Sequence, residues 1–280
     1  MQEIRGKDVI ARMKEEMQKE LAGMDYVPRL AIVRVGERPD DMSYERGAMK
    51  RMEGIGLRCS TYTFPASVSN EAVTKAFLEI NDEEDIDGIL LLRPLPKHID
   101  EKNIEKMIDP AKDIDGISPT NISKVFAGEE DGFAPCTAEA VIETLQFMGE
   151  PLSGKRAVVI GRSMVVGKPL SMLLLKQNCT VTVCHTKTIN MPDVCKGAEI
   201  LVACAGQAKM VDASYVGKDA VVMDVGINVD ENGKLCGDVA YDTIQDVAGA
   251  ATPVPGGIGT VTTSVLAKHL IRAAKQRRNR

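Results

Sequence analysis

The sequence predicts an α/β protein of two lobes: an N-terminal α/β substrate domain and a Rossmann-like dinucleotide-binding domain, with a cleft between them. Three observations support this fold class. The chain has 280 residues, a length that suits two domains of ordinary size. Apolar runs of strand length alternate with amphipathic helical segments. A glycine-containing turn at residues 161–167 follows one such run and opens a helix, as in many nucleotide-binding proteins.

The first half of the chain alternates between helical and strand patterns. Val9, Met13 and Met17 recur at helical spacing, and an apolar run follows that ends before Gly36. Strands that alternate with helices pair in parallel, so we expect a mostly parallel sheet. The predicted helices are 8–22, 43–54 and 69–81, and the predicted strands are 30–35, 57–64 and 88–92.

The end of the first lobe is marked by prolines and glycines. Pro94 and Pro96 stop the last strand in a loop at the carboxyl edge of the sheet, where α/β proteins bind ligands. A helix over 137–148 leads to the boundary segment 149–155. The first domain is predicted to comprise residues 1–142 plus 265–280, and the second residues 143–264.

The second lobe repeats the alternation. The strands are predicted at 156–160, 180–184, 200–204 and 220–225, and a helix follows the glycine turn as far as residue 176. The closing segment 261–274 has the pattern of a helix with one apolar face, and we expect it to pack back onto the first lobe.

Bulk composition excludes several function classes. The net charge is −5 and the chain has no Trp, five Tyr and five Phe. A broad surface that neutralises phosphate backbones or anionic lipid is therefore not expected, and stacking platforms for nucleic acid are scarce. No apolar run of about 18 residues occurs, which favours a cytoplasmic protein with no membrane partner. The basic tail, residues 275–280, is interpreted as a solubilising end.

Cysteine usage indicates neither disulfides nor a metal. The seven Cys are an odd number and show no paired CxxC spacing, as expected for reduced thiols in a cytosol. Cys184-His185 with Cys179 and Cys195 forms the tightest cluster, but its spacing matches no zinc pattern. No metal site is predicted.

The turn from Gly161 to Gly167 is the strongest ligand signal in the sequence. It lies between a strand pattern and a helix pattern, so a phosphate could meet free backbone N–H groups and the positive end of the helix. The spacing differs from GxGxxG. A glycine-rich turn without a ligand is the alternative.

The end of the second strand of this lobe favours NADP over NAD. NAD-binding folds usually carry an acidic residue there, whereas this strand is followed by His185, Thr186 and Lys187. Together with Arg162 these residues could face a 2′-phosphate. His185 could equally be a hydrogen-bonded residue at a strand end.

A proline- and glycine-rich loop occupies residues 252–260. Two prolines, Pro253 and Pro255, fix its backbone, while Gly256, Gly257 and Gly259 allow a ligand to approach closely. We expect a rigid loop beside a cofactor. The alternative is a turn without a ligand.

Along nearly its whole length the chain resembles the bifunctional methylenetetrahydrofolate dehydrogenase/methenyltetrahydrofolate cyclohydrolase family. The resemblance implies folate bound on the first domain, NADP or NAD on the second, and a homodimer. It is carried by these ordered stretches: Asp87-Gly88-Ile89-Leu90 with Pro94-Leu95-Pro96, Lys112-Asp113-Ile114-Asp115-Gly116, Pro135-Cys136-Thr137, Gly161-Arg162-Ser163 with Val166-Gly167-Lys168-Pro169, and Thr252-Pro253-Val254-Pro255-Gly256-Gly257.

Position by position, the resemblance suggests a set of site residues. Asp115 would hold the pterin ring through its amino and ring nitrogens, and Tyr44 would line the folate pocket; both are the catalytic candidates. Pro255, Gly256 and Gly257 would shape the junction of the two ligands. The cofactor-binding candidates, some of them from the turn and strand-end patterns above, are Gly161, Arg162, Ser163, Gly167, His185, Thr186, Gly206 and Ile227.

Two positions depart from the family pattern. The family usually has a lysine four residues after the tyrosine, tied to the cyclohydrolase step, and this chain has Ala48 there. A supporting glutamine is replaced by Leu92. Lys50 is near in sequence, but two residues rotate a helix by roughly 200°, so it should point away.

The two chemical steps should respond differently to these replacements. Hydride removal leaves a cation that the folate nitrogens stabilise, so the step depends on alignment with the nicotinamide. Hydrolysis of the methenyl cation needs proton transfer, where a positioned ionisable group contributes about 10²–10⁴ in rate. We therefore expect a dehydrogenase with weak or absent cyclohydrolase activity.

Three other interpretations stay open. Lys50 or an ordered water could replace the lysine and preserve both activities. The chain could be a catalytically silent NADP-binding regulatory protein, although the presence of Tyr44 and Asp115 argues against this. It could also be another two-lobed dehydrogenase acting on a small acid, but no His or Lys is placed to support that chemistry.

Overall fold

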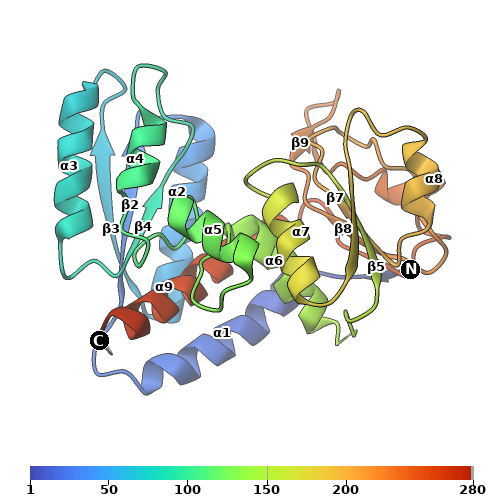
Figure 1. The fold of residues 1–280 in the computed structure, drawn as a ribbon, viewed down its shortest axis with the longest axis horizontal. Helices are drawn as coiled ribbons and strands as arrows, with labels where there is room; N and C mark the ends of the chain where they lie inside the picture. Colours follow the sequence, from blue (N-terminus) through green and yellow to red (C-terminus); the bar gives the residue numbers. More distant parts are fainter. Residues whose placement is uncertain (150, 279–280) are drawn as a thin grey trace. The chain divides into compact units, whose positions relative to one another are not determined.

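The computed structural model describes residues 1–149 and 151–278, and the chain divides into two compact units (Figure 1). The three-stranded unit comprises Arg12–Cys136 and Thr263–Arg280, and the six-stranded unit comprises Met1–Ala11 and Thr137–Thr262. Each unit has its own parallel sheet, as the alternation of strand and helix patterns predicts.

In the three-stranded unit, β2 (Arg29–Val35) lies between β3 (Arg58–Phe64) and β4 (Gly88–Leu91), and both pairings are parallel. Ala31 and Val33 belong to a buried cluster with Phe77 and Ile104, so this face of the sheet packs against α3 and α4. The helices of this unit are α2 (Pro39–Ile55), α3 (Asn70–Asp82), α4 (Glu101–Met107), α5 (Pro119–Ala127) and most of α1 (Gly6–Ala22) and α9 (Thr262–Arg278).

Helix α2 begins four residues before its predicted start. Pro39 stands in its first turn, followed by Asp40 and Asp41. Proline suits this position because the first helical N–H groups have no internal partner, and acidic residues favour the positive end of a helix. The helix ends at Ile55, and the next residue, Gly56, has a left-handed φ of 100° that suits glycine.

Residues 275–278 of the basic tail belong to helix α9. Asp87 is fully buried, and its carboxylate accepts hydrogen bonds from the Arg29 N–H (2.9 Å), the Arg277 guanidinium (3.3 Å) and the Arg278 guanidinium (3.4 Å). The Arg278 guanidinium also lies over the Tyr26 ring at 4.0 Å. The end of α9 therefore fixes the start of β4, and α9 packs on the three-stranded unit as predicted.

The six-stranded sheet has the order β1-β11-β8-β7-β5-β6, with every pairing parallel. Its buried core includes Val158, Ile160, Leu201 and Val222. The strands are β1 (Gln2–Glu3), β5 (Arg156–Ile160), β6 (Thr180–Cys184), β7 (Ile200–Ala203), β8 (Val221–Asp224) and β11 (Ala250–Ala251), and the helices are α6 (Cys136–Phe147), α7 (Gly167–Lys176) and α8 (Met191–Lys196).

The first eleven residues lie in a different unit from the one the sequence predicts. We assigned residues 1–142 to the first domain, but β1 pairs with β11 at the edge of the six-stranded sheet. Two-residue strands such as β1 and β11 carry no periodic pattern, so sequence could not locate this pairing. The short helices α4, α5 and α8 were likewise not predicted.

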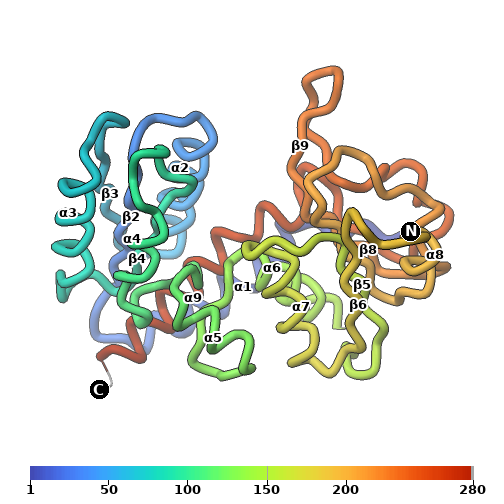
Figure 2. The backbone as a smooth tube through the Cα atoms, turned by 45° about the horizontal axis from the view of Figure 1, so that its top comes forward, coloured from blue at the N-terminus to red at the C-terminus, as the bar shows by residue number. Residues whose placement is uncertain are grey.

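A hairpin projects from the six-stranded unit (Figure 2). It is formed by β9 (Asn228–Val229) and β10 (Leu235–Cys236), which pair antiparallel. Val229 is 66% exposed and Leu235 is 46% exposed.

In the part of the chain that the structure describes, no helix is both long and apolar enough to cross a membrane.

Candidate functional site

The carboxyl edge of the six-stranded sheet brings together the predicted cofactor residues of this unit. β6 and β7 lie on opposite sides of β5, so the order in which the chain adds strands to the sheet reverses at β5. Ligands of open α/β sheets bind at such a switch point, outside the carboxyl ends of the strands. Gly161 follows β5, Gly206 follows β7 and Ile227 follows β8.

Gly161 marks a close approach between the loops after β5 and β7. Its φ is +131°, and a Cβ added there would lie 2.3 Å from the carbonyl oxygen of Cys204. Gly167, the first residue of α7, is as tightly placed, because its Cβ would lie 2.2 Å from the Gly161 oxygen. Both glycines are therefore required by backbone packing, because a side chain at either position would displace the loop after β7 or the start of α7.

The turn between the two glycines presents backbone and polar groups at the start of α7. The Ser163 Oγ accepts a hydrogen bond from the Val166 N–H (3.1 Å), and Arg162 and Ser163 are both exposed. The first turn of α7 contains no acidic residue. An anion would therefore meet the positive end of the helix without a competing carboxylate.

The residues after β6 form a short turn of their own. The Lys187 N–H donates to the His185 Nδ1 (3.1 Å), and the His185 N–H donates to the Thr188 Oγ1 (2.9 Å). His185 is half-buried, while Thr186 and Lys187 are exposed. His185 thus stabilises this turn, and Thr186 and Lys187 are the two side chains of the turn that a ligand could contact.

The proline- and glycine-rich loop is supported by the N-terminal segment. The Gly6 N–H donates to the Gly256 carbonyl oxygen (2.9 Å), and a Cβ at Gly6 would lie 2.5 Å from the Gly257 oxygen. Gly257 is itself constrained, because its Cβ would lie 2.4 Å from the Pro253 oxygen. Pro255 and Gly256 are exposed, so the tip of the loop is free to face a ligand.

In the three-stranded unit, Asp115 lies in a loop that a neighbouring aspartate shapes. The buried Asp113 carboxylate accepts hydrogen bonds from the Ile117 N–H (3.0 Å) and the Ser118 N–H (2.8 Å). The Asp115 Oδ1 accepts one from the Cys136 N–H (3.2 Å). Burial raises the pKa of the Asp115 carboxyl, and the hydrogen bond from Cys136 opposes that shift.

The helix α2 carries Tyr44, Ala48 and Arg51 along one stripe, since residues four and seven apart lie on the same face. Tyr44 is half-buried and Ala48 is fully buried. Lys50 is exposed, as the helical rotation predicts. Lys50 therefore does not lie on the same face of α2 as Tyr44 and Ala48.

Arg51 is a residue that the sequence analysis missed. It is half-buried, and its Nε donates to the Thr263 Oγ1 (3.3 Å). Burial lowers the pKa of its guanidinium, and no described carboxylate forms an ion pair with it. The spacing of seven residues from Tyr44 was the available signal.

Leu92 is buried, with only 6% of its surface exposed. Its N–H donates to the Val33 carbonyl oxygen (2.9 Å), which continues the pairing of β2 with β4. The next residue, Arg93, pairs through its guanidinium with the Glu105 carboxylate (2.6 Å). Positions 48 and 92 thus both hold buried apolar side chains.

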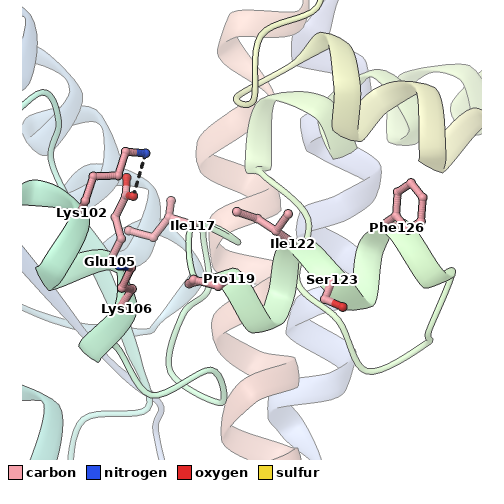
Figure 3. A pocket seen from close by; sticks show the side chains of 8 residues that line it. All are labelled: Lys102, Glu105, Lys106, Ile117, Pro119, Ile122, Ser123 and Phe126. Atoms are coloured by element: carbon pink, nitrogen blue, oxygen red, sulfur yellow. Dashed lines mark hydrogen bonds and ion pairs between the residues drawn. The ribbon is translucent and has the colours of Figure 1, made fainter.

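A separate groove lies between α4 and α5 (Figure 3). It has a volume of about 410 Å³ and is lined by apolar side chains such as Ile117, Ile122 and Phe126, with the Lys102–Glu105 ion pair (3.3 Å) at one end. None of the predicted site residues lines it.

Among the described residues, no three His, Cys, Asp or Glu side chains gather as a metal site would require.

The comparisons with known proteins decide the family. Residues 4–115 match the tetrahydrofolate dehydrogenase/cyclohydrolase catalytic domain, and residues 135–278 match the NAD(P)-binding domain of the same family. The chain belongs to the tetrahydrofolate dehydrogenase/cyclohydrolase family. The resemblance inferred from the sequence motifs is therefore confirmed.

Two similar proteins align with this chain over nearly its whole length. The Bifunctional protein FolD of Carboxydothermus hydrogenoformans is 49% identical over 275 residues, which cover 96% of each chain. That of Clostridioides difficile is 48% identical over 280 residues and covers 99% of this chain and 98% of its own.

Solved structures confirm the fold class. The FolD methylenetetrahydrofolate dehydrogenase/cyclohydrolase of Campylobacter jejuni superimposes with a TM-score of 0.95 at 33% identity, covering 99% of each chain. The Trypanosoma brucei enzyme, complexed with NADP cofactor and an inhibitor, has a TM-score of 0.92 at 34% identity and covers 99% of this chain and 98% of its own.

Proposed function

We propose that this protein oxidises 5,10-methylenetetrahydrofolate to 5,10-methenyltetrahydrofolate by hydride transfer to NADP, in one-carbon metabolism. The observation that carries the proposal is the turn from Gly161 to Gly167 at the switch point of the six-stranded sheet. Two glycines whose Cβ atoms would meet backbone atoms at 2.3 Å and 2.2 Å hold this turn against the start of α7, and the free N–H groups of a helix start suit a pyrophosphate. NADP, when bound, supplies the hydride acceptor.

The folate half of the proposal rests on Asp115 and Tyr44. A carboxylate held by the Cys136 N–H (3.2 Å) suits the paired N–H donors of a pterin ring, because two oxygens can accept two parallel hydrogen bonds. Tyr44 offers an aromatic wall for the substrate. Pro255, Gly256 and Gly257 complete the substrate-binding set that we propose.

We propose NADP as the preferred cofactor, with NAD as the alternative. The segment after β6 contains Thr186 and Lys187, both exposed, and no carboxylate that would bind ribose hydroxyls. The exposed Arg162 adds a second cation for a 2′-phosphate. Gly206 and Ile227 complete the cofactor-binding set that we propose.

Weak or absent cyclohydrolase activity is the second part of the proposal. Ala48 and Leu92 are both buried, and neither side chain can transfer a proton. The dehydrogenase step does not need this help, because the folate nitrogens stabilise the product cation.

A fully bifunctional enzyme is the second candidate, and Arg51 favours it. Arg51 follows Ala48 by three residues, so the two lie on the same face of α2. Its half-buried guanidinium has no described acidic partner, so it could orient a water or stabilise negative charge. It cannot act as a general base, since arginine stays protonated.

One paired assay tests these alternatives. Purified protein is given methylenetetrahydrofolate with NADP or NAD, and cofactor reduction is followed; loss of methenyltetrahydrofolate absorbance is then followed without cofactor. We expect reduction of NADP and hydrolysis near the buffer rate. Rapid hydrolysis that Arg51→Gln abolishes would establish the bifunctional candidate. Cofactor binding without any turnover would instead support a silent regulatory protein.

We also propose that the chain works as a cytoplasmic homodimer. The exposed Val229 and Leu235 of the β9–β10 hairpin are apolar surface of the kind that association covers. Sedimentation equilibrium should give twice the chain mass, and Val229→Asp with Leu235→Asp should shift it toward the monomer. A wild-type monomer at micromolar concentration would contradict the proposal.

A further inference from the structure

A single buried carboxylate, Asp238, binds the loops that follow two neighbouring strands, β7 and β8. The residue is 0% exposed. Its Oδ2 accepts hydrogen bonds from the N–H groups of Ala205 (2.6 Å) and Gly206 (2.9 Å), and its Oδ1 accepts them from the Gln207 N–H (2.8 Å) and the Asn228 Nδ2 (2.9 Å). Four donors therefore satisfy one carboxylate.

Asp238 is itself held by a second buried carboxylate at the end of β8. The Asp224 Oδ1 accepts from the N–H groups of Gly226 (3.0 Å) and Asp238 (2.9 Å), and its Oδ2 accepts from the Val239 N–H (3.0 Å). A Cβ at Gly226 would lie 2.4 Å from the Asp238 Cγ, and one at Gly237 would lie 1.8 Å from the Asp224 Oδ2. The two carboxylates and the two glycines leave no room for a different backbone path.

The loops that Asp238 holds are the ones assigned above to the cofactor. The Gly206 N–H is one of its four donors, and Ile227 lies between Gly226, which packs on the carboxylate, and Asn228, which donates to it. The N–H groups of residues 205–207 are already occupied by Asp238. They therefore cannot form the phosphate site, which is left to the turn from Gly161 to Gly167.

We propose that Asp238 is a positioning residue for the dinucleotide. It fixes the 205–207 loop and the 226–228 segment at the separation that the cofactor requires, and it acts through Gly206 and Ile227 without touching the cofactor. A bare carboxylate near an anionic dinucleotide would oppose binding; the four donors offset part of its negative charge. The inference rests on the proposed NADP-dependent activity.

The test uses Asp238→Asn in the full chain. The substitution keeps the shape but places an amide N–H₂ against two backbone donors, which leaves buried groups unpaired. We expect the Kd for NADPH, measured by its fluorescence, to rise about tenfold or more, and the KM for NADP to rise with it. The KM for methylenetetrahydrofolate should change less than about twofold, because the folate residues Tyr44 and Asp115 lie in the other unit.

Asp230→Asn is the matched control. Asp230 belongs to the same unit and its carboxylate also accepts several hydrogen bonds, from the Lys209 Nζ (2.9 Å) and the N–H groups of Asn232 (3.0 Å) and Lys234 (3.0 Å). It organises the hairpin turn and not the 205–207 loop. The Kd for NADPH should stay within about twofold of wild type, although the melting temperature falls.

Asn228→Ala keeps the test decisive if Asp238→Asn fails to fold. It removes one of the four donors and releases the 226–228 segment, so the Kd for NADPH should rise several-fold in a folded protein. An unchanged Kd in a folded variant overturns the inference, as does an equal rise in both KM values. If wild-type protein neither binds NADPH nor reduces NADP, the proposed function fails, and the positioning inference fails with it.

Discussion

The proposed cofactor site at the carboxyl edge of the six-stranded sheet, called here the cofactor edge, differs from helix α2 of the three-stranded unit in the kind of atoms that form it. The cofactor edge is built from backbone: Gly161 and Gly167 pack on main-chain atoms, and Asp238 accepts main-chain N–H groups. The α2 stripe is built from side chains on a regular helix, where a substitution such as Ala48→Lys need not change the backbone. We therefore expect substitutions at the first site to disturb the backbone, whereas substitutions on α2 can change a chemical step and leave the fold intact.

The largest effect should follow from adding a single methyl group at the cofactor edge. Gly161→Ala places a Cβ 2.3 Å from the Cys204 oxygen at a φ of +131°, which alanine rarely adopts. We expect the Kd for NADPH to rise by about 10² or more. Gly233→Ala is the control, because its φ is also positive (+72°) but nothing lies within 4 Å of its Cβ. Equal losses in both variants would show that backbone strain, and not the loop contact, decides binding.

The second effect concerns the folate carboxylate. Asp115→Asn keeps one acceptor but replaces the other with a donor facing the pterin, so kcat/KM for methylenetetrahydrofolate should fall by about 10–10². The Kd for NADPH should not change, since the cofactor residues belong to the other unit. Wild-type steady-state kinetics in the variant would remove Asp115 from the site.

A gain of activity is the third prediction. Ala48→Lys together with Leu92→Gln restores the polar pair on the three-stranded unit, and we expect methenyltetrahydrofolate hydrolysis to rise about tenfold or more. Each single variant is the control, because the lysine alone has no supporting amide. Hydrolysis that stays at the buffer rate in the double variant would mean that these two positions do not limit the second step.

The fourth effect concerns stability and not activity, and it is a pH dependence at the carboxyl end of β8. Burial raises the pKa of Asp224 to about 6, above the value of about 3.9 for an unfolded chain. The native state therefore binds the extra proton between pH 4 and 6, so this group's contribution to stability is present below about pH 4 and lost as the pH rises through 6. Its size is on the order of 1–3 kcal/mol.

Denaturant unfolding at pH 4.5 and pH 7 measures this contribution. Asp224→Asn removes the titrating group, so the difference between the two pH values should become smaller or change sign relative to wild type. The same difference in both proteins would mean that Asp224 does not titrate in this range.

Most of the regular fold follows from the sequence, and the exceptions share a cause. The strands β2 to β8 and the long helices are periodic enough to predict, and α9 lies on the three-stranded unit as expected. The two-residue strands β1 and β11 were missed, because two residues carry no period. Their pairing places Gly6 against Gly256 and Gly257, which only the folded chain brings together.

The sequence by itself determined the family, the glycines of the phosphate turn and the absence of a lysine at position 48, because each is a residue type at a fixed place in a motif. The tertiary structure decided what surrounds those residues. Arg51 shares the stripe of Ala48 through seven-residue spacing on α2, and Asp238 reaches Gly206 from 32 positions along the chain. Long-range hydrogen bonds of buried carboxylates leave no periodic trace in a sequence, because they depend on loops that only the packed sheet brings side by side.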